Sequence, residues 1–138
     1  DFVRAADSQS KGQTPWTPAV TLCQGLDVAL ERLLNEGLQQ SFARHTALAN
    51  TFRRGAAALG LGFLAAEGVR SDTVTALLAP KGTPAESITG RLRSEFGIEI
   101  AGGQGPLQGK IVRVGHMGYC TEADLQDVLQ ALGKVLGR

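Results

Sequence analysis

The chain has 138 residues, of which 43% are hydrophobic, so it can form one domain with a buried core. Its formal net charge is +1 and both signs are interspersed along the chain, a pattern that does not favour a nucleic acid or an anionic membrane as partner. Its apolar runs are far shorter than the roughly 20 residues that cross a bilayer, and it does not open on a basic-then-apolar leader, so we expect a soluble, cytoplasmic protein.

The first third of the chain predicts a short lead and then a helix. Residues 1–12 show little periodicity and predict a helical or irregular segment followed by a loop. Thr17 and Pro18 predict a helix start, because a hydroxyl can cap the first turn and proline is tolerated at the first helical position. Gly37 ends the pattern. The apolar face of this helix consists of Cys23, Leu26, Leu30 and Leu33.

A second helical pattern begins at Leu38 and ends before Gly60, a residue typical of the position after a helix. Its apolar seam consists of Leu38, Phe42, His45, Ala49, Phe52, Ala56 and Leu59. Its opposite face carries Gln39, Gln40, Arg44, Arg53 and Arg54. We expect the first set to pack against the core and the second to face solvent or a partner.

Two strands are predicted after this helix, over residues 61–65 and 73–79, with a turn between them. Thr83 and Glu86 stand in capping-box register at the start of a further helix, which Gly97 ends. The core-facing stripe of that helix consists of Ile88, Leu92 and Phe96.

Two more strands, over residues 98–101 and 110–115, flank a glycine-rich connection, and Thr121 with Asp124 predicts a capping box for the last helix. The apolar face of the last helix consists of Leu125, Val128, Leu129, Leu132, Val135 and Leu136. The order α, α, β, β, α, β, β, α is typical of an α+β fold. We expect a small, mostly antiparallel sheet with helices on one face and a long N-terminal helix.

The glycine-rich connection GGQGPLQG does not match a phosphate-binding loop. Gln104 and Ile111 occupy positions where a Walker loop needs a glycine and a hydroxyl, and Gln108 stands where a dinucleotide fingerprint needs a glycine. Arg113 is unusual in the strand that follows, because a permanently charged guanidinium among apolar residues needs an acceptor. A structural ion pair and an anion-binding role both stay open for it. Two roles also stay open for Thr17. It could be a helix cap alone, or it could in addition be part of a phosphate site at the helix start.

The residue types that bind metals are too scattered for a metal site. Cys23 and Cys120 form no CxxC pair, and we expect two free, reduced thiols. His45 lies on an apolar helix seam, where a packed histidine with one hydrogen bond is expected, and His116 follows the arginine-bearing strand and could face a site. No third ligand accompanies the histidines, so no metal is expected.

Four features, in this order and at these intervals, resemble the C-terminal part of class V pyridoxal-phosphate aminotransferases. They are TPAV at residues 17–20, the pair Arg44 and His45, the block GGQGPLQGKIVRVGHMG at residues 102–118, and the final amphipathic helix. The most similar group is the serine–glyoxylate, alanine–glyoxylate and serine–pyruvate aminotransferases, including a cyanobacterial branch that is labelled as the small, tritium-exchange subunit of a soluble hydrogenase. The resemblance implies the small C-terminal domain of a fold-type-I enzyme.

The resemblance also implies roles for particular residues. Arg113 matches the arginine that binds the substrate carboxylate, and Thr17 matches the threonine that reaches the cofactor phosphate of the neighbouring subunit. Thr14 stands where many family members have a tyrosine that contacts the same phosphate. In the family the Schiff-base lysine lies upstream of the threonine–proline motif, which puts it before Asp1, so we expect this chain alone to be inactive.

The organisation implied is that of an incomplete enzyme. Residues 1–16 would be a lead or linker from a large domain, residues 17–60 a helical strut, and residues 61–138 the α+β small domain. The cofactor would be pyridoxal 5'-phosphate, the substrates a small amino acid such as serine or alanine and a 2-oxo acid such as glyoxylate or pyruvate, and the full-length protein a homodimer.

Two alternatives to the transaminase stay open. One is a non-catalytic α+β domain for ligand binding or interaction, in which the arginine strand is structural. The other is a different reaction of the same cofactor on the same fold, such as that of a lyase. A cysteine desulfurase is disfavoured because Cys120 lies at the approach to a helix and not in a mobile catalytic loop.

Overall fold

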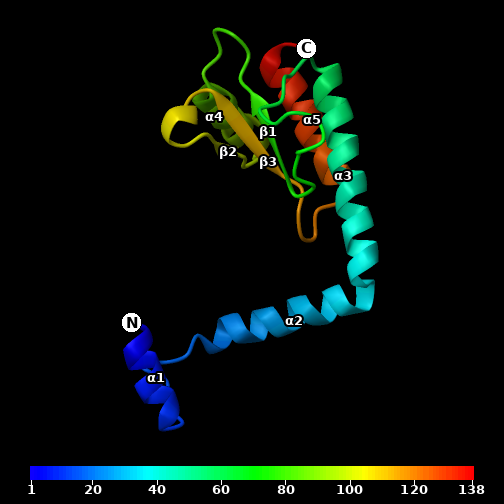
Figure 1. The fold of residues 1–138 in the computed structure, drawn as a ribbon. Coiled ribbons are helices and arrows are strands. Elements are labelled where there is room, and N and C mark those ends of the chain that lie inside the picture. The colour runs from blue at the N-terminus through cyan, green and yellow to red at the C-terminus, as the bar shows by residue number, and fades with distance from the viewer. The chain divides into compact units, whose positions relative to one another are not determined.

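The computed structural model describes all 138 residues, with α-helices, one short 3-10 helix and a three-stranded sheet (Figure 1). By their internal contacts the residues divide into two compact units, residues 1–41 and residues 42–138. No helix combines the length and the apolar character that a membrane crossing requires.

Residues 1–41 are mainly helical. Helix α1 spans Phe2–Ser10, and the carboxylate of Asp1 caps it by accepting the backbone N–H of Val3 at 3.0 Å. Helix α2 spans Val20–Glu36 and ends at Gly37, whose φ of +87° confirms the predicted break. Neither helix buries a residue within this chain. The exposed apolar side chains of α2 are Val20, Leu22, Leu26, Val28, Leu30 and Leu34.

The predicted helix start at Thr17 is wrong. The N-cap of α2 is Ala19, and no side chain makes a capping hydrogen bond there. The carbonyl of Pro18 accepts the N–H of Val20 at 2.8 Å, so a tight turn precedes the helix and both Thr17 and Pro18 lie outside it. The hydroxyl of Thr17 is therefore not used as a helix cap.

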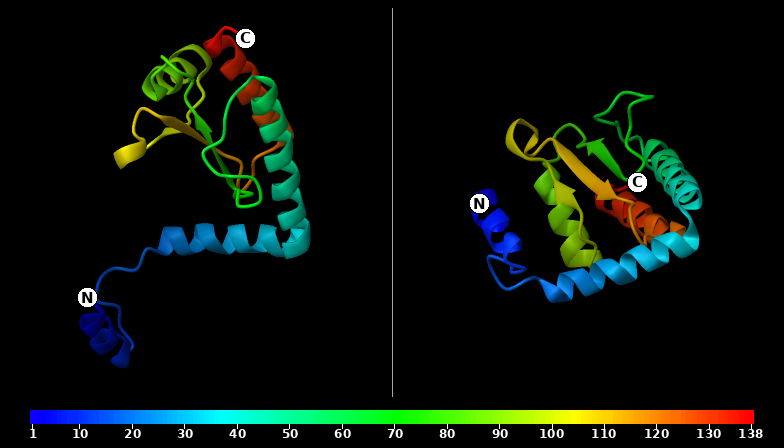
Figure 2. Two further views of the ribbon diagram at one scale, coloured as in Figure 1. Left: turned by 45° about the horizontal axis from the view of Figure 1, so that its top comes forward. Right: turned by 60° about the horizontal axis from the view of Figure 1, so that its bottom comes forward.

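Residues 42–138 contain the sheet, whose strand order is β1-β3-β2 with antiparallel neighbours throughout. The strands are β1 (Val74–Leu78), β2 (Ala101–Gly102) and β3 (Ile111–Gly115). The helices are α4 (Ala85–Phe96), α5 (Glu122–Leu136) and the greater part of α3 (Leu38–Ala58), whose first four residues are counted in the other unit. Figure 2 shows α4 and α5 on one face of the sheet. This confirms the α+β fold class, with its small antiparallel sheet and its helices on one face.

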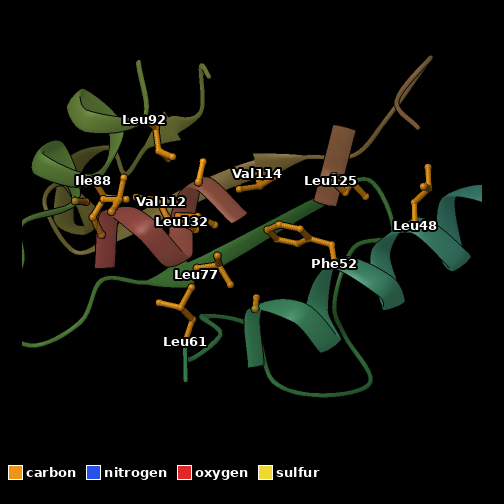
Figure 3. Close-up of a cluster of buried hydrophobic side chains, with 14 residues drawn as sticks. Leu48, Phe52, Leu61, Leu77, Ile88, Leu92, Val112, Val114, Leu125 and Leu132 are labelled. Carbon is orange, nitrogen blue, oxygen red and sulfur yellow. The ribbon is translucent and has the colours of Figure 1, made fainter. Parts of the chain in front are cut away.

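The core lies where the sheet meets the helices (Figure 3). Leu77 of β1 and Val112 and Val114 of β3 point to this side, because alternate residues of a strand face alternate sides. The helices contribute the buried side chains Phe52, Ile88, Leu92, Leu125 and Leu132. The predicted stripes of α4 and α5 are thus part of this core, as are Phe52 and Ala56 of the α3 seam. Ala49 of that seam is also buried, whereas Leu38 and Phe42 are exposed.

Two local predictions at helix ends are confirmed. Gly97 ends α4 with a φ of +67°, a left-handed conformation that glycine adopts at little cost. Thr121 and Asp124 form the predicted capping box of α5, with Asp124 accepting the backbone N–H of Thr121 at 2.8 Å.

The capping box predicted for α4 is wrong. Pro84 is the N-cap, and neither Thr83 nor Glu86 caps the helix through its side chain. The backbone N–H of Ala85 donates instead to the carbonyl of Gly109, at 3.1 Å. The first N–H group of the helix is therefore satisfied by a carbonyl that is distant in sequence, and the local sequence does not reveal this partner.

The strand predicted over residues 61–65 is also not a strand. Only Phe63 forms an isolated bridge, with Leu77, flanked by backbone hydrogen bonds from Leu64 to Ala76 and from Leu78 to Gly62. The strand predicted over residues 98–101 is shorter and later, since β2 contains only Ala101 and Gly102.

Adjacent leucines of β1 provide a matched test of this core. Leu77→Ala should lower the free energy of unfolding by about 3 kcal/mol, because the side chain is fully buried and its removal leaves a cavity. Leu78→Ala should cost less than about 1 kcal/mol, because that side chain is 42% exposed. Urea unfolding followed by circular dichroism measures both, and equal losses would contradict the packing described.

Candidate functional site

Arg113 lies in the middle of β3, on the sheet face opposite to the core. Its neighbours Val112 and Val114 are buried, whereas its own side chain is half-buried. Its Cα partners in the two flanking strands are Ala76 and Ala101. Because both partners have small side chains, the guanidinium is flanked by little more than methyl groups.

The guanidinium of Arg113 is held by one contact. Its Nε donates to the carbonyl of Gly102 at 2.9 Å. No carboxylate of this chain lies within ion-pair distance of Arg113. Since an arginine has five N–H donors, the donors of the two terminal nitrogens are left for an acceptor outside the chain. The structural ion pair, one of the two roles left open by the sequence, is therefore absent here.

The glycine-rich connection between β2 and β3 supports this arrangement. A side chain at Gly103 would lie 2.0 Å from the carbonyl oxygen of Leu107, so only glycine fits there. The segment Gly105–Leu107 forms a 3-10 turn, and Gly109 has a φ of +73°. The glycines thus let the connection fold back tightly on itself, which positions the Gly102 carbonyl beside Arg113.

The segment that follows β3 is anchored by the buried His116. Its Nδ1 lies 3.1 Å from the carbonyl oxygen of Asp72, which can only accept, so Nδ1 carries the proton. Its Nε2 then accepts the hydroxyl of Thr75, at 2.8 Å. The ring also packs near that of Phe52, with centroids 6.1 Å apart. His116 is therefore a structural residue with both nitrogens occupied, and it does not face an open site.

Burial lowers the pKa of His116, and the positive charge of Arg53 lowers it further, against the opposing effect of the hydrogen bond to Asp72. The neutral ring also matches its hydrogen bonds, because protonated Nε2 could no longer accept from Thr75.

Two residues of α3 hold the next part of this segment. The Nε2 atom of His45 accepts the backbone N–H of Gly118 at 3.2 Å, and Arg44 donates to the Gly118 carbonyl at 3.0 Å. The histidine expected to be packed with a hydrogen bond is thus a partly buried residue that fixes a loop. Together with His116, these contacts tie the end of β3 to the core.

The two threonines singled out in the sequence lie in the other unit, in the segment between α1 and α2. The hydroxyl of Thr14 donates to the carbonyl of Trp16 at 2.7 Å. Thr17 is exposed and precedes the N-terminus of α2, which no side chain caps. The structure therefore brings Thr14 and Thr17 into one segment, while Arg113 belongs to residues 42–138.

Both cysteines are free thiols, with Cys23 exposed and Cys120 partly buried. No three side chains among the His, Cys, Asp and Glu residues are grouped as a metal site would require. The contacts of Arg113 to Gly102 and of His116 to Thr75 could not be read from the sequence, because each joins positions whose pairing depends on the strand register.

No protein-family model matches the chain. The chain is 43% identical over 117 residues to an uncharacterized aminotransferase of Methanocaldococcus jannaschii, a match that covers 85% of this chain and 30% of that protein. It is 40% identical to the small subunit of a soluble hydrogenase of Synechococcus, over 99% of this chain and 35% of that protein. It is 36% identical to a serine–glyoxylate aminotransferase of Hyphomicrobium methylovorum, over 95% of this chain and 32% of that protein.

A comparison with solved structures also finds aminotransferases. The crystal structure of pyridoxamine–pyruvate aminotransferase from Mesorhizobium loti matches with a TM-score of 0.84 and 36% identity, over 89% of this chain and 32% of that chain. This chain thus spans about a third of the length of the proteins it matches.

The protonation of His116 makes the stability depend on pH. Because its pKa in the folded chain is lowered below the value of about 6.5 in an unfolded chain, the unfolded state binds more protons at acidic pH. The free energy of unfolding should therefore fall as the pH is lowered from about 7 to 5. The His116→Gln variant should show a smaller fall in urea unfolding over this range, and an identical pH slope in both proteins would contradict the assignment.

Proposed function

We propose that this chain, which belongs to the class V aminotransferases like its homologues and structural neighbours, forms the C-terminal domain of such an enzyme. The proposed reaction moves an amino group between a small amino acid, such as serine or alanine, and a 2-oxo acid, such as glyoxylate or pyruvate. The observation that carries the proposal is Arg113, a half-buried guanidinium without a carboxylate partner on the open face of the sheet.

In this proposal Arg113 binds the carboxylate that amino acids and 2-oxo acids share. A planar guanidinium grips a carboxylate through two parallel hydrogen bonds, which fix the orientation of the substrate as well as its position. The contact of Nε with the Gly102 carbonyl supports this role, because it holds the guanidinium in place and leaves other donors available. The alanines beside it leave room for a substrate.

The cofactor of the proposed enzyme is pyridoxal 5'-phosphate, which when bound supplies the electron sink for proton transfer at the α-carbon of the amino acid. Thr17 fits its phosphate, because an exposed hydroxyl stands before a helix N-terminus that no side chain caps, and the helix dipole favours an anion there. Thr14 is a weaker candidate, since its hydroxyl already donates to the Trp16 carbonyl.

The proposed enzyme is a homodimer in which Thr17 reaches the cofactor phosphate of the partner subunit. The residue that would bind the cofactor covalently is assigned to the part of the enzyme that this chain does not contain. We therefore expect this chain alone to be inactive, and the activity and cofactor-binding measurements on Arg113 and Thr17 variants require the intact protein.

Replacement of Arg113 by lysine tests the carboxylate role. Arg113→Lys keeps the charge but loses the two-pronged grip, so it should raise the KM for the amino donor roughly 10-fold to 100-fold, with the visible absorbance of the cofactor unchanged. Arg93→Lys is the matched control, because Arg93 is an exposed arginine that pairs with Glu99 on the surface. An unchanged KM in Arg113→Lys would refute the assignment and favour a non-catalytic domain.

Replacement of Thr17 tests the phosphate role independently of the substrate. Thr17→Val should weaken the binding of pyridoxal phosphate about tenfold, since it removes one hydrogen bond to a charged group, and should leave the KM for the amino donor nearly unchanged. Thr14→Val should have a smaller effect, because its hydroxyl is engaged with Trp16. Cofactor titration by absorbance measures both, and equal losses in the two variants would contradict the ranking.

A further inference from the structure

A hollow of about 350 Å³ lies between α3 and the connection from α3 to β1. It is lined by Asn50, Arg53, Arg54, Glu67, Gly68 and Arg70. None of these residues belongs to the sheet face that carries Arg113 or to the segment that carries Thr17. The proposed function therefore gives this hollow no role.

Arg70 is fixed with its terminal nitrogens unoccupied. Its Nε donates to the carbonyl of Ala65 at 3.1 Å, and its guanidinium carbon lies 4.3 Å from the centroid of the Phe63 ring. A guanidinium that stacks on a ring and is held through Nε presents its other donors in a fixed plane. The lost side-chain entropy on binding a ligand would therefore be small.

The guanidinium of Arg53 is held through its terminal nitrogens, and its Nε donor has no acceptor. Its terminal nitrogens contact the carbonyl of Ser71 and, at 3.6 Å, the carboxylate of Asp72, and its side chain is only 13% exposed. Its Nε is buried and has no hydrogen-bond partner. Because this atom is sealed from solvent, it cannot contact a ligand in the hollow directly, and Arg53 contributes its positive charge to the lining.

The balance of charge around the hollow is positive. Arg54 adds a third guanidinium, whose only recorded contact is with the hydroxyl of Thr51 in the same helix, at 3.1 Å. The lining offers one carboxylate, Glu67, and Asp72 is shared between Arg53 and the hydroxyl of Thr46. Like charges that line one hollow repel one another, and an anion between them reduces that repulsion.

We propose that this hollow binds a small oxoanion, either a phosphate or a carboxylate, between Arg54 and Arg70. The planar forks of the two guanidinium groups match the oxygen atoms of both kinds of anion. The site is independent of the proposed cofactor and substrate contacts, because it uses other residues of other elements.

The test is a titration of this chain, followed by the Nε–H resonances of its arginines in two-dimensional NMR. One arm adds inorganic phosphate and the other adds acetate, each at an ionic strength kept constant with sodium chloride. Saturable shifts of the Arg54 and Arg70 resonances are expected in at least one arm. Tighter binding in the phosphate arm assigns a phosphate site, and tighter binding in the acetate arm assigns a carboxylate site.

Variants make the test specific. Arg54→Gln should lower the affinity for the anion at least about fivefold, the loss expected for one charge-assisted hydrogen bond. Arg93→Gln, outside the hollow, should leave the affinity unchanged, as should Thr17→Val, which removes the other candidate phosphate contact. Dispersed spectra establish that each variant is folded.

Two results would overturn the proposal. One is a set of shifts that grow linearly and equally at Arg54, Arg70 and Arg93, which is a general effect of added salt. The other is an Arg54→Gln variant with the affinity of the unmodified chain. Because neither cofactor nor catalysis enters this experiment, such results would leave the proposed aminotransferase function untouched.

Discussion

Strand β3 buries two valines and still carries a guanidinium because successive side chains of a strand point to opposite faces of the sheet. Val112 and Val114 pack against the helices, so the side chain of Arg113 between them lies on the other face of the sheet. Antiparallel pairing with β1 and β2 places an alanine on each side of it. The core packing that stabilises the fold is therefore also what sets the direction of the candidate substrate-binding residue.

The segments before and after β3 are fixed by hydrogen bonds and by a tight turn. Before the strand, the tight turn at Gly103 positions the Gly102 carbonyl that accepts from Arg113. After it, His116 bonds to β1 through Thr75, and Gly118 bonds to His45 of α3. A binding residue must be held within a fraction of an ångström of its productive position, and these contacts supply that support.

The sequence predicted those features that local chemistry decides. The capping box of Thr121 with Asp124 and the stop at Gly97 involve residues close in sequence, and the stripes of α4 and α5 follow the helical period. Features that depend on distant partners were missed or wrong. The start of α4 is satisfied by Gly109, and the hydrogen bonds of His116 need the register of β1 with β3. The roles of Arg113 and Thr17 came from the family resemblance and stay predictions.

A crystal structure of the intact protein with its cofactor and a bound amino acid would show directly whether Arg113 binds the substrate carboxylate. If it does, the terminal nitrogens of Arg113 should lie about 2.7–2.9 Å from the two carboxylate oxygens. A carboxylate bound by other residues, with Arg113 still in contact only with the Gly102 carbonyl, would contradict this role.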